Sequence, residues 1–306
     1  LPAAAEELEG TLTFMAADYS PRMTPFWEKA IEEFKAKHPK VNVELEVVGW
    51  QQNHDTMAQR LAAGDLPDIA NTATMWIPEF VESGGMKPIS EDMISPELRE
   101  AFIPGILKNG AAYRDEIWGM PMVAHTRGMF WNKDIFKEAG LDPEKPPVTW
   151  DEFKHAVLTI HEKTGKFGYG FDAKGVQAFR YFGIFLWNNG GDYFGEDGKA
   201  AFNSPEGVEA MTFLAELVKA GAVPDPTGTN MEEVEDQFVG GRMGIIIDGA
   251  YFVATLRDKA PNISYGVTTA PIAKEGKPNV VVGVTDALVV SKNAEPELVR
   301  AFFDVA

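Results

Sequence analysis

The sequence predicts an α/β protein in which short strands alternate with helices. Segments with the two-residue period of a strand are followed by segments with helical spacing, and Gly or Pro marks the turns between them. The apolar fraction of 45% is ordinary for a globular protein. At roughly 150 residues per domain, the 306 residues predict about two domains.

The first part of the chain has the pattern of three strand–helix pairs. A strand over residues 11–15 places Leu12 and Phe14 on one face, and residues 41–47 alternate strictly between apolar and polar side chains. Thr24 and Pro25 are typical of a helix start, with Thr24 as the N-cap. The expected helices cover residues 24–37, 55–63 and 76–83, and the third strand covers 67–70. This order predicts a parallel sheet with helices on its faces.

The later part of the chain continues the alternation. A long apolar run over residues 117–132 is interpreted as one strand that passes between two sheets. Thr149 and Glu152 have the spacing of a helix capping box, and Ser204 precedes a proline at another helix start. The remaining expected elements are strands at 168–171, 243–247, 264–268 and 284–291, helices at 179–187, 249–256 and from residue 296, and a hairpin over 192–202.

The charge and the cysteine content exclude several classes of function. Lys and Arg number 28 against 46 Asp and Glu, so the net charge is −18, which disfavours nucleic acid and anionic lipid surfaces. The longest uninterrupted apolar stretches, such as residues 280–284 and 287–290, fall far short of the ~20 residues of a membrane-spanning helix. The absence of Cys excludes disulfides, thiolate chemistry and a lipid attached through an N-terminal Cys. Ala3–Ala5 resembles the end of a secretory signal and predicts export.

The sequence contains no recognisable catalytic or metal-binding motif. The five His lack the spacing of a zinc site, and no nucleophile elbow, Walker loop or dinucleotide-binding glycine motif follows a strand. We therefore expect no catalytic residue, no cofactor and no metal. One alternative stays open, because two of the 46 acidic residues could form the carboxylate pair of a glycan-processing enzyme.

Aromatic and polar side chains recur together at the ends of the expected strands. Ligands of an open parallel sheet bind beyond the carboxyl ends of its strands. A flat aromatic ring there can stack on a sugar, while Asp, Asn and Gln bind its hydroxyl groups. The groups are Asp18 with Tyr19, Trp50 with Gln51, Asn71 and Thr72 with Trp76, Trp187 with Asn188 and Asn189, and Asp248 with Tyr251.

From about Gly10 to the last residue, the chain resembles the extracellular solute-binding proteins of ABC importers, in the branch that includes maltose-binding protein. Each motif is weak alone, but nine occur in the expected order. They are AIEEF at 30–34, His38–Pro39, LPDI at 66–69, IWGMP at 117–121, WNKDIFKEAGL at 131–141, TWDEF at 149–153, NGG at 189–191, FNSPEG at 202–207 and Asp248–Gly249.

The resemblance implies a class II-like periplasmic-binding-protein fold, in which two α/β lobes joined by crossover strands close on a ligand. The first lobe would be discontinuous, comprising residues 1–124 and 285–306, and the second would comprise 125–284. Relatives continue beyond the helix that begins at Pro296 and cross between the lobes a third time. The resemblance therefore also implies that the second lobe is truncated at its C-terminal end.

The resemblance places ligand-facing positions at the strand ends, at the first crossover and on one helix. Those positions hold Asp18, Tyr19, Asn71, Thr72, His125, Gln177, Arg180 and Tyr251, and the residue pattern adds Gln51, Trp76, Trp187 and Asp248. Many sugar-binding relatives carry Gly-Gly-Trp where this chain has Val284-Thr285-Asp286. The carboxylate of Asp286 replaces a stacking ring, which argues against a plain maltodextrin ligand.

These observations predict a periplasmic substrate-binding protein that captures a sugar or polyol and delivers it to the transmembrane subunits of an ABC permease. The ligand would be a mono-, di- or short oligosaccharide, and the exported protein, its signal removed, would be a monomer that diffuses freely. Two alternatives remain. Asp18, Asp248 and Asp286 could bind a cationic or zwitterionic solute, and a carboxylate pair could make the protein a glycan-processing enzyme.

Overall fold

The computed structural model describes residues 8–19 and 22–306, so the Ala-rich segment that predicts export lies outside the described residues. The described chain divides into two compact units. Unit 1 comprises the residues up to Ala124 together with Thr285–Ala306, and unit 2 comprises His125–Val284. Strands β7 (Gly119–Asn132) and β11 (Gly283–Ser291) each contain residues of both units, so the chain passes between the units within strands.

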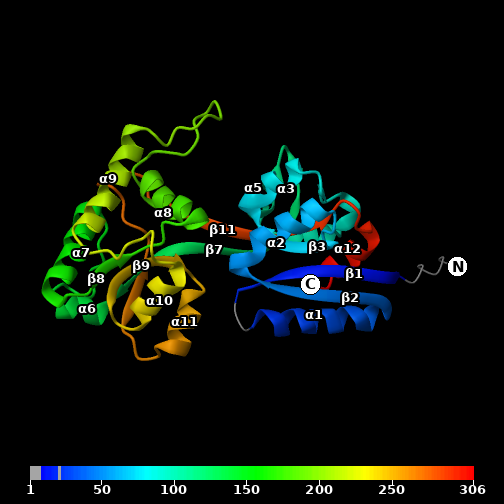
Figure 1. The fold of residues 1–306 in the computed structure, drawn as a ribbon, viewed down its shortest axis with the longest axis horizontal. Coiled ribbons are helices and arrows are strands. Elements are labelled where there is room, and N and C mark those ends of the chain that lie inside the picture. The colour runs from blue at the N-terminus through cyan, green and yellow to red at the C-terminus, as the bar shows by residue number, and fades with distance from the viewer. Residues whose placement is uncertain (1–7, 20–21) are drawn as a thin grey trace. The chain divides into compact units, whose positions relative to one another are not determined.

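Unit 1 is built on a mixed sheet with the strand order β2-β1-β3-β11. Strand β1 (Glu9–Asp18) is parallel to β2 (Lys40–Gly49) and β3 (Ile69–Ala73), whereas β11 is antiparallel to β3 and to β4 (Met86–Lys87). Helices α1 and α2 lie on opposite sides of β1 and β2 (Figure 1). The helices are α1 (Met23–Lys37), α2 (Trp50–Ala63), α3 (Ile77–Glu82), α4 (Pro96–Ala101), α5 (Pro104–Gly110) and α12 (Pro296–Phe303), with 3-10 turns at Thr74–Trp76 and Glu91–Met93 and a hairpin of β5 (Ala112–Tyr113) and β6 (Glu116–Ile117).

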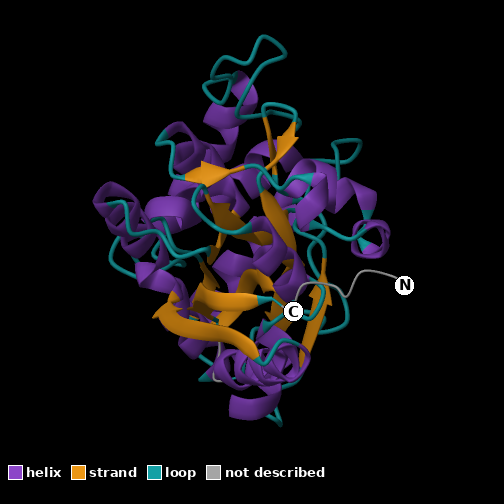
Figure 2. Cartoon of the chain, turned by 90° about the vertical axis from the view of Figure 1, so that its right-hand side faces the viewer, coloured by secondary structure: helices purple, strands orange, loops and turns teal. Residues whose placement is uncertain are grey.

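The alternation of β1 explains why both faces of the unit 1 sheet are covered. Leu12 and Phe14 belong to the core that includes α1 and α12, and the Phe14 and Trp27 rings are in edge contact at 4.6 Å. Met15 points to the other face, where Met57 of α2 belongs to a second core. Helices accordingly flank the strands on both sides (Figure 2). This is the arrangement that successive strand–helix pairs predict.

Unit 2 has its own smaller sheet. Strand β9 (Met243–Gly249) is parallel to β8 (Phe167–Gly170) and antiparallel to β7, and β7 also pairs with β10 (Tyr265–Thr268). Its helices are α6 (Lys133–Glu138), α7 (Trp150–Thr164), α8 (Gly175–Asn188), α9 (Pro205–Lys219), α10 (Met231–Val239) and α11 (Phe252–Lys259).

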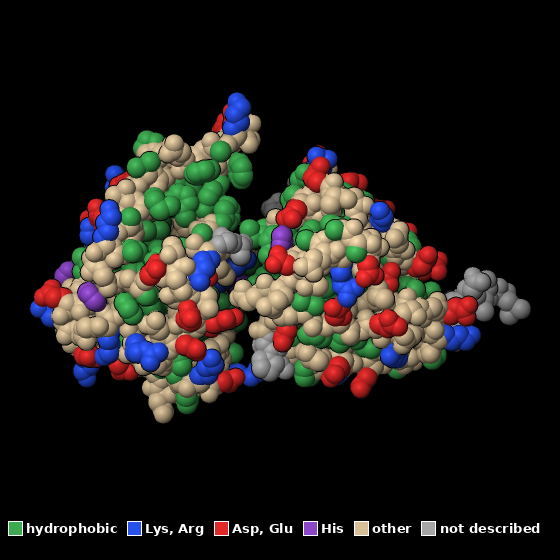
Figure 3. All heavy atoms as spheres, viewed as in Figure 1, with side chains coloured by type: hydrophobic (Ala, Val, Ile, Leu, Met, Phe, Trp, Pro, Cys, Tyr) green, Lys and Arg blue, Asp and Glu red, His purple; other side chains and the backbone are tan. Residues whose placement is uncertain are grey.

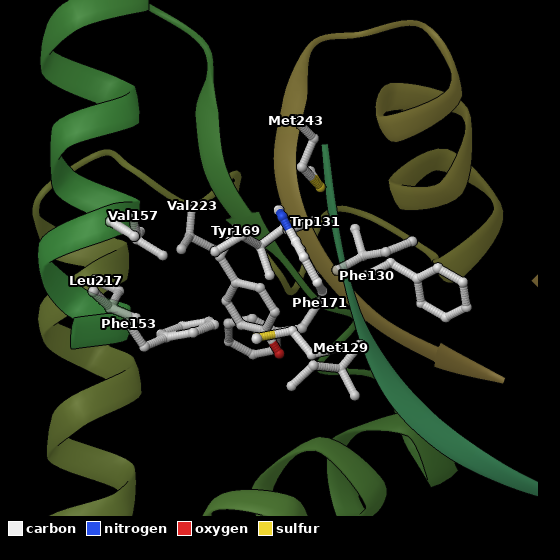
Figure 4. Packing of buried hydrophobic residues seen from close by; sticks show 14 of the residues in the cluster. Met129, Phe130, Trp131, Phe153, Val157, Tyr169, Phe171, Leu217, Val223 and Met243 are labelled. Carbon is white, nitrogen blue, oxygen red and sulfur yellow. The ribbon is translucent and has the colours of Figure 1, made fainter. Parts of the chain in front are cut away.

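An aromatic core fills unit 2. Consecutive residues Met129, Phe130 and Trp131 of β7 are all buried, because elements pack on both faces of this strand. Figure 4 shows Tyr169 of β8 between β7 and α7, and its ring meets that of Phe153 edge-on at 5.1 Å. The alternating pattern of an exposed strand is therefore absent here, which explains the long apolar run in the sequence.

Several element boundaries differ from the sequence predictions. The capping box of Thr149 and Glu152 is confirmed. Helix α1, however, begins at Met23 with Arg22 as N-cap, so Pro25 occupies the first turn, where a backbone N–H has no helical partner. Helix α2 begins at Trp50 rather than at residue 55. Its first buried position is the polar Asn53, so the apolar periodicity did not reveal the first turn.

Three further segments differ from the prediction. Residues 192–202 form a loop with a single isolated pair, Phe194 with Ala200, rather than a hairpin. Helix α11 begins at Phe252, because Gly249 still belongs to β9 and pairs with Arg127 of β7. Residues 86–117, for which no element was predicted, contain β4, α4, α5 and the β5–β6 hairpin.

Candidate functional site

Asn71, the central residue of β3, organises the polar side chains of unit 1. Its buried Oδ1 accepts hydrogen bonds from the Tyr19 hydroxyl at 3.0 Å and from the Ala17 N–H at 3.3 Å. Its Nδ2 donates to the Ala287 carbonyl oxygen at 3.3 Å. The Asn71 amide therefore joins β1, β3 and β11 and fixes the Tyr19 side chain. In this structure Asn71 positions other groups, and its own amide is occupied.

Tyr19 lies beside Asp286, which follows the crossover from unit 2 on β11. Asp286 is buried, and burial together with its carboxylate raises the pKa of Tyr19 far above the ordinary value. Tyr19 is consequently a neutral hydroxyl at physiological pH. The neighbouring Thr285 carbonyl oxygen accepts a hydrogen bond from Thr74 Oγ1 at 2.8 Å, which ties β11 to the turn after β3.

Among the buried polar atoms of unit 1, Asn53 Oδ1 and Thr72 Oγ1 lie close to this group and lack a partner within the described residues. Asn53 Nδ2 donates to the Asn71 carbonyl oxygen at 3.0 Å, but Asn53 Oδ1 has no hydrogen-bond partner within residues 8–19 and 22–306. Thr72 Oγ1 also has no hydrogen-bond partner among the described residues. Buried polar atoms are rarely left unpaired, because each such atom costs about 1–3 kcal/mol. A polar ligand or water can complete them.

A row of aromatic rings lies next to this polar group. The Tyr19 and Trp50 rings are 5.1 Å apart, and Trp50 stacks on Trp76 with centroids 5.3 Å apart and planes inclined by 22°. His54 meets Trp76 edge-on, and its Nε2 lies 2.9 Å from Glu79 Oε2. Asp18 and Gln51, both predicted as ligand residues, are exposed beside Tyr19 and Trp50.

In unit 2 the predicted residues Asp248 and Tyr251 meet a residue that the sequence reasoning missed. Arg127 of β7 is only 7% exposed, and its Nη1 forms an ion pair with Oδ1 of Asp248, whose side chain is fully buried. The Tyr251 hydroxyl donates to the same Oδ1 at 2.6 Å and accepts from Arg127 Nη1 at 3.2 Å. The Tyr251 residue is 45% exposed, so its ring presents surface while its hydroxyl is held.

His125 packs against this ion cluster. Its ring meets that of Tyr251 edge-on at 5.6 Å, and its buried Nδ1 has no hydrogen-bond partner among the residues that the structure describes. Burial, with the positive charges of Arg127 and Arg180, lowers the pKa of His125 to about 4. At neutral pH the imidazole is therefore uncharged and can accept or donate one hydrogen bond through Nδ1, depending on its tautomer.

The three predicted residues of α8 are not brought to one place. Arg180 is buried and contributes to the electrostatic field at His125, and Gln177 is partly exposed. Trp187 instead donates its indole N–H to Asp192 Oδ1 at 3.0 Å and packs edge-on against Tyr193, which stacks on Phe179. Hydrophobic side chains gather on the surface over α8 (Figure 3). Trp187 thus belongs to an aromatic cluster separate from the Arg127 ion cluster.

No signal in the sequence pointed to Arg127, because it stands in an apolar strand 121 positions from its partner Asp248. Trp50 was named from the sequence together with Gln51, and Asn53 could have been found, since it also follows the strand end at Gly49. The described residues hold no group of three or more His, Asp or Glu side chains arranged for a metal ion. None of the described helices has the length and apolar composition that crossing a bilayer needs.

The family model for bacterial extracellular solute-binding proteins matches residues 17–306. The chain belongs to this family. It is 27% identical over 288 residues to a putative binding protein of Brucella abortus, covering 94% of this chain and 69% of the relative. It is 26% identical over 260 residues to a maltotriose-binding protein of Pyrococcus abyssi, covering 84% of this chain and 53% of the relative.

A solved structure confirms the predicted fold. The solute-binding protein of an ABC transporter from Thermotoga lettingae, bound with α-D-tagatose, superposes with a TM-score of 0.84 at 27% identity. The match covers 96% of this chain and 76% of that one. The predicted family and its α/β, two-lobed solute-binding fold are therefore confirmed. This family consists of extracellular solute-binding proteins rather than enzymes.

Proposed function

We propose that this protein is the substrate-binding component of an ABC importer and captures a sugar or polyol of one to a few units. The observation that carries the proposal is the row of Tyr19, Trp50 and Trp76 rings beside the unpaired buried atoms of Asn53 and Thr72. Ring faces stack on the C–H faces of a sugar, while unpaired polar atoms bind its hydroxyl groups. Both features occur together in unit 1.

Unit 2 carries candidate ligand groups of its own. Tyr251 offers a partly exposed ring with a fixed hydroxyl, and His125 offers an unpaired, uncharged nitrogen. Asp286 would accept hydroxyl hydrogen bonds, as predicted from the sequence. Of the remaining predicted ligand residues, Asn71 and Asp248 would act by positioning, because their bonded oxygens already accept protein donors.

The mechanism we propose requires no covalent chemistry. The two units would act as the two lobes that the family resemblance implies, and the ligand would favour the closed state of the protein. Such a shift needs a ligand that binds one arrangement more tightly than the other. The loaded protein would then deliver the solute to the transmembrane subunits of the permease. We place it in the periplasm after removal of a signal.

A thermal-shift screen tests the proposal. We expect at least one of D-tagatose, D-mannitol, maltose and maltotriose to raise the melting temperature, and calorimetry to measure its affinity. Amino sugars and quaternary amines belong in the same screen, since stabilisation by these alone would favour the cationic-solute alternative. Release of reducing ends from oligosaccharides would contradict the non-enzymatic mechanism.

A further inference from the structure

Glu235 of α10 is a partly exposed acidic residue whose carboxyl group lies against the buried Asp248. Its carboxyl group is close enough to that of Asp248 to share a hydrogen bond, and its Oε1 lies 3.4 Å from the Tyr251 hydroxyl oxygen. Asp248 itself is fully buried. Two carboxylates in contact repel each other strongly, and the fully buried one is not screened by water, so one proton is shared between them in the stable state.

The hydrogen bonds of Asp248 indicate where that proton lies. Oδ1 accepts from Arg127 Nη1, from the Tyr251 hydroxyl and from the Gly249 N–H, the last two at 2.6 Å. Oδ2 is buried and receives no donor from an N–H or hydroxyl group within residues 8–19 and 22–306. Oδ1 therefore accepts three hydrogen bonds, whereas Oδ2 accepts none from these groups. A protonated Glu235 can supply the missing donor to Oδ2.

We propose that Glu235 is a positioning residue, which as a neutral carboxylic acid donates its proton to Asp248 Oδ2 and so fixes the Asp248 carboxylate that orients Arg127 and Tyr251. Without this donor, the buried carboxylate can rotate to satisfy its second oxygen and release the Tyr251 hydroxyl. The role in ligand binding rests on the proposed function, in which the Tyr251 ring contacts the solute. The protonation of Glu235 does not depend on it.

The electrostatic surroundings agree with this assignment. The groups that face Glu235 are Asp248 of β9, Tyr251 before α11, Arg127 of β7 and Tyr181 of α8. Burial and the Asp248 charge raise the pKa of Glu235 to about 9, although Arg127 acts in the opposite direction. The pKa values of Tyr181 and Tyr251 are raised far above 10, so both stay neutral while Glu235 titrates.

The sign of the pH dependence follows from the raised pKa. The folded protein holds the Glu235 proton at pH values where the unfolded chain has released it. The stabilising contribution is therefore complete below about pH 4.3, the ordinary value for Glu. It declines as the pH rises and is lost above the folded-state pKa of about 9.

Isotope-edited infrared spectroscopy of the unliganded protein tests the protonation directly. At pH 7 we expect a carboxylic acid C=O band in the wild type that disappears as the pH is raised through about 9. The Glu235→Gln variant should lack this band, whereas Glu232→Gln, which changes an exposed residue of the same helix, should retain it. Equal bands in the wild type and Glu235→Gln would overturn the proposal.

Calorimetric titration with D-tagatose, D-mannitol and maltose then tests the positioning role. The affinity of the wild type should fall as the pH is raised through the folded-state pKa of Glu235. The Gln side chain can donate to Asp248 Oδ2 at every pH, so Glu235→Gln should bind with wild-type affinity at pH 7 and should not lose affinity at alkaline pH. Glu235→Ala should bind about tenfold more weakly, because a buried carboxylate oxygen loses its donor. Weak binding by Glu235→Gln at pH 7 would overturn the role. If none of the three binds even to the wild type, the proposed function is contradicted, while the infrared result still decides the state of Glu235.

Discussion

Units 1 and 2 organise their candidate ligand groups by different physical means. In unit 1 a neutral amide, Asn71, connects three strands and holds Tyr19, while Asn53 and Thr72 keep buried polar atoms unpaired. In unit 2 a buried ion pair of Arg127 and Asp248 holds the Tyr251 hydroxyl. Neutral amides make a site whose geometry is insensitive to pH. A buried charge cluster fixes side chains more strongly, but it makes the fold depend on protonation.

The largest expected effect comes from breaking the ion cluster of unit 2. Arg127→Met leaves Asp248 buried without its cation, which should lower the free energy of unfolding by about 3–5 kcal/mol. Urea denaturation followed by tryptophan fluorescence measures the loss. Arg257→Met is the matched control, because Arg257 pairs with Asp258 at the surface and should cost no more than about 1 kcal/mol. Equal losses in the two variants would contradict the role of the buried ion pair in stabilising unit 2.

A glycine comparison sharpens the same contrast. A Cβ at Gly249 would lie 2.5 Å from Tyr251 Cε1 and 3.0 Å from His125 Nδ1, so Gly249→Ala must displace both rings. At Gly49 of unit 1 the added Cβ would meet only the end of the flexible, exposed Gln52 side chain. We expect Gly249→Ala to lower the free energy of unfolding, measured by thermal unfolding, by about 1–3 kcal/mol. Gly49→Ala should stay within about 0.5 kcal/mol, and the reverse order would count against the packing described for unit 2.

The ring row of unit 1 should affect affinity more than stability. Removing the central ring with Trp50→Ala should weaken binding of the sugar identified in the thermal-shift screen by about 1–3 kcal/mol, or roughly 5- to 150-fold. Trp50→Phe keeps an aromatic face and should recover most of that loss. Isothermal titration calorimetry measures both variants. Wild-type affinity in Trp50→Ala would remove the ring row from the proposed site.

A further expected effect is a loss of stability at acidic pH, caused by His125 of unit 2. The pKa of His125 is lowered to about 4, so between about pH 4 and the ordinary value near 6.5 the unfolded chain binds the His proton more readily than the folded chain. The stabilising contribution of the uncharged His125 to the folded state is therefore complete above about pH 6.5 and is lost as the pH falls toward 4. Melting temperatures of wild type and His125→Asn across this range measure the effect. Identical slopes would show that His125 is not shielded from protonation.

The sequence predicted correctly those helix and strand boundaries that are marked by capping or turn residues only a few positions apart. Thr149 and Glu152 are three positions apart, so their capping box could be predicted, and its geometry is confirmed. The start of α2 was missed because Asn53, a polar residue, occupies a buried helical position and is held by the Asn71 carbonyl oxygen. That hydrogen bond joins residues 18 positions apart and leaves no periodic trace in the sequence.

Apolar periodicity and turn residues are local properties of the chain, so the α/β class, the family and the strand ends near Tyr19 and Tyr251 could be predicted from the sequence. Only the tertiary structure decided which side chains meet. Arg127 reaches Asp248 across 121 positions, and Asn71 reaches Ala287 across 216, through strand pairings that no local pattern specifies. The charge states of His125 and Glu235 follow from burial beside those partners, so they too exist only in the folded chain.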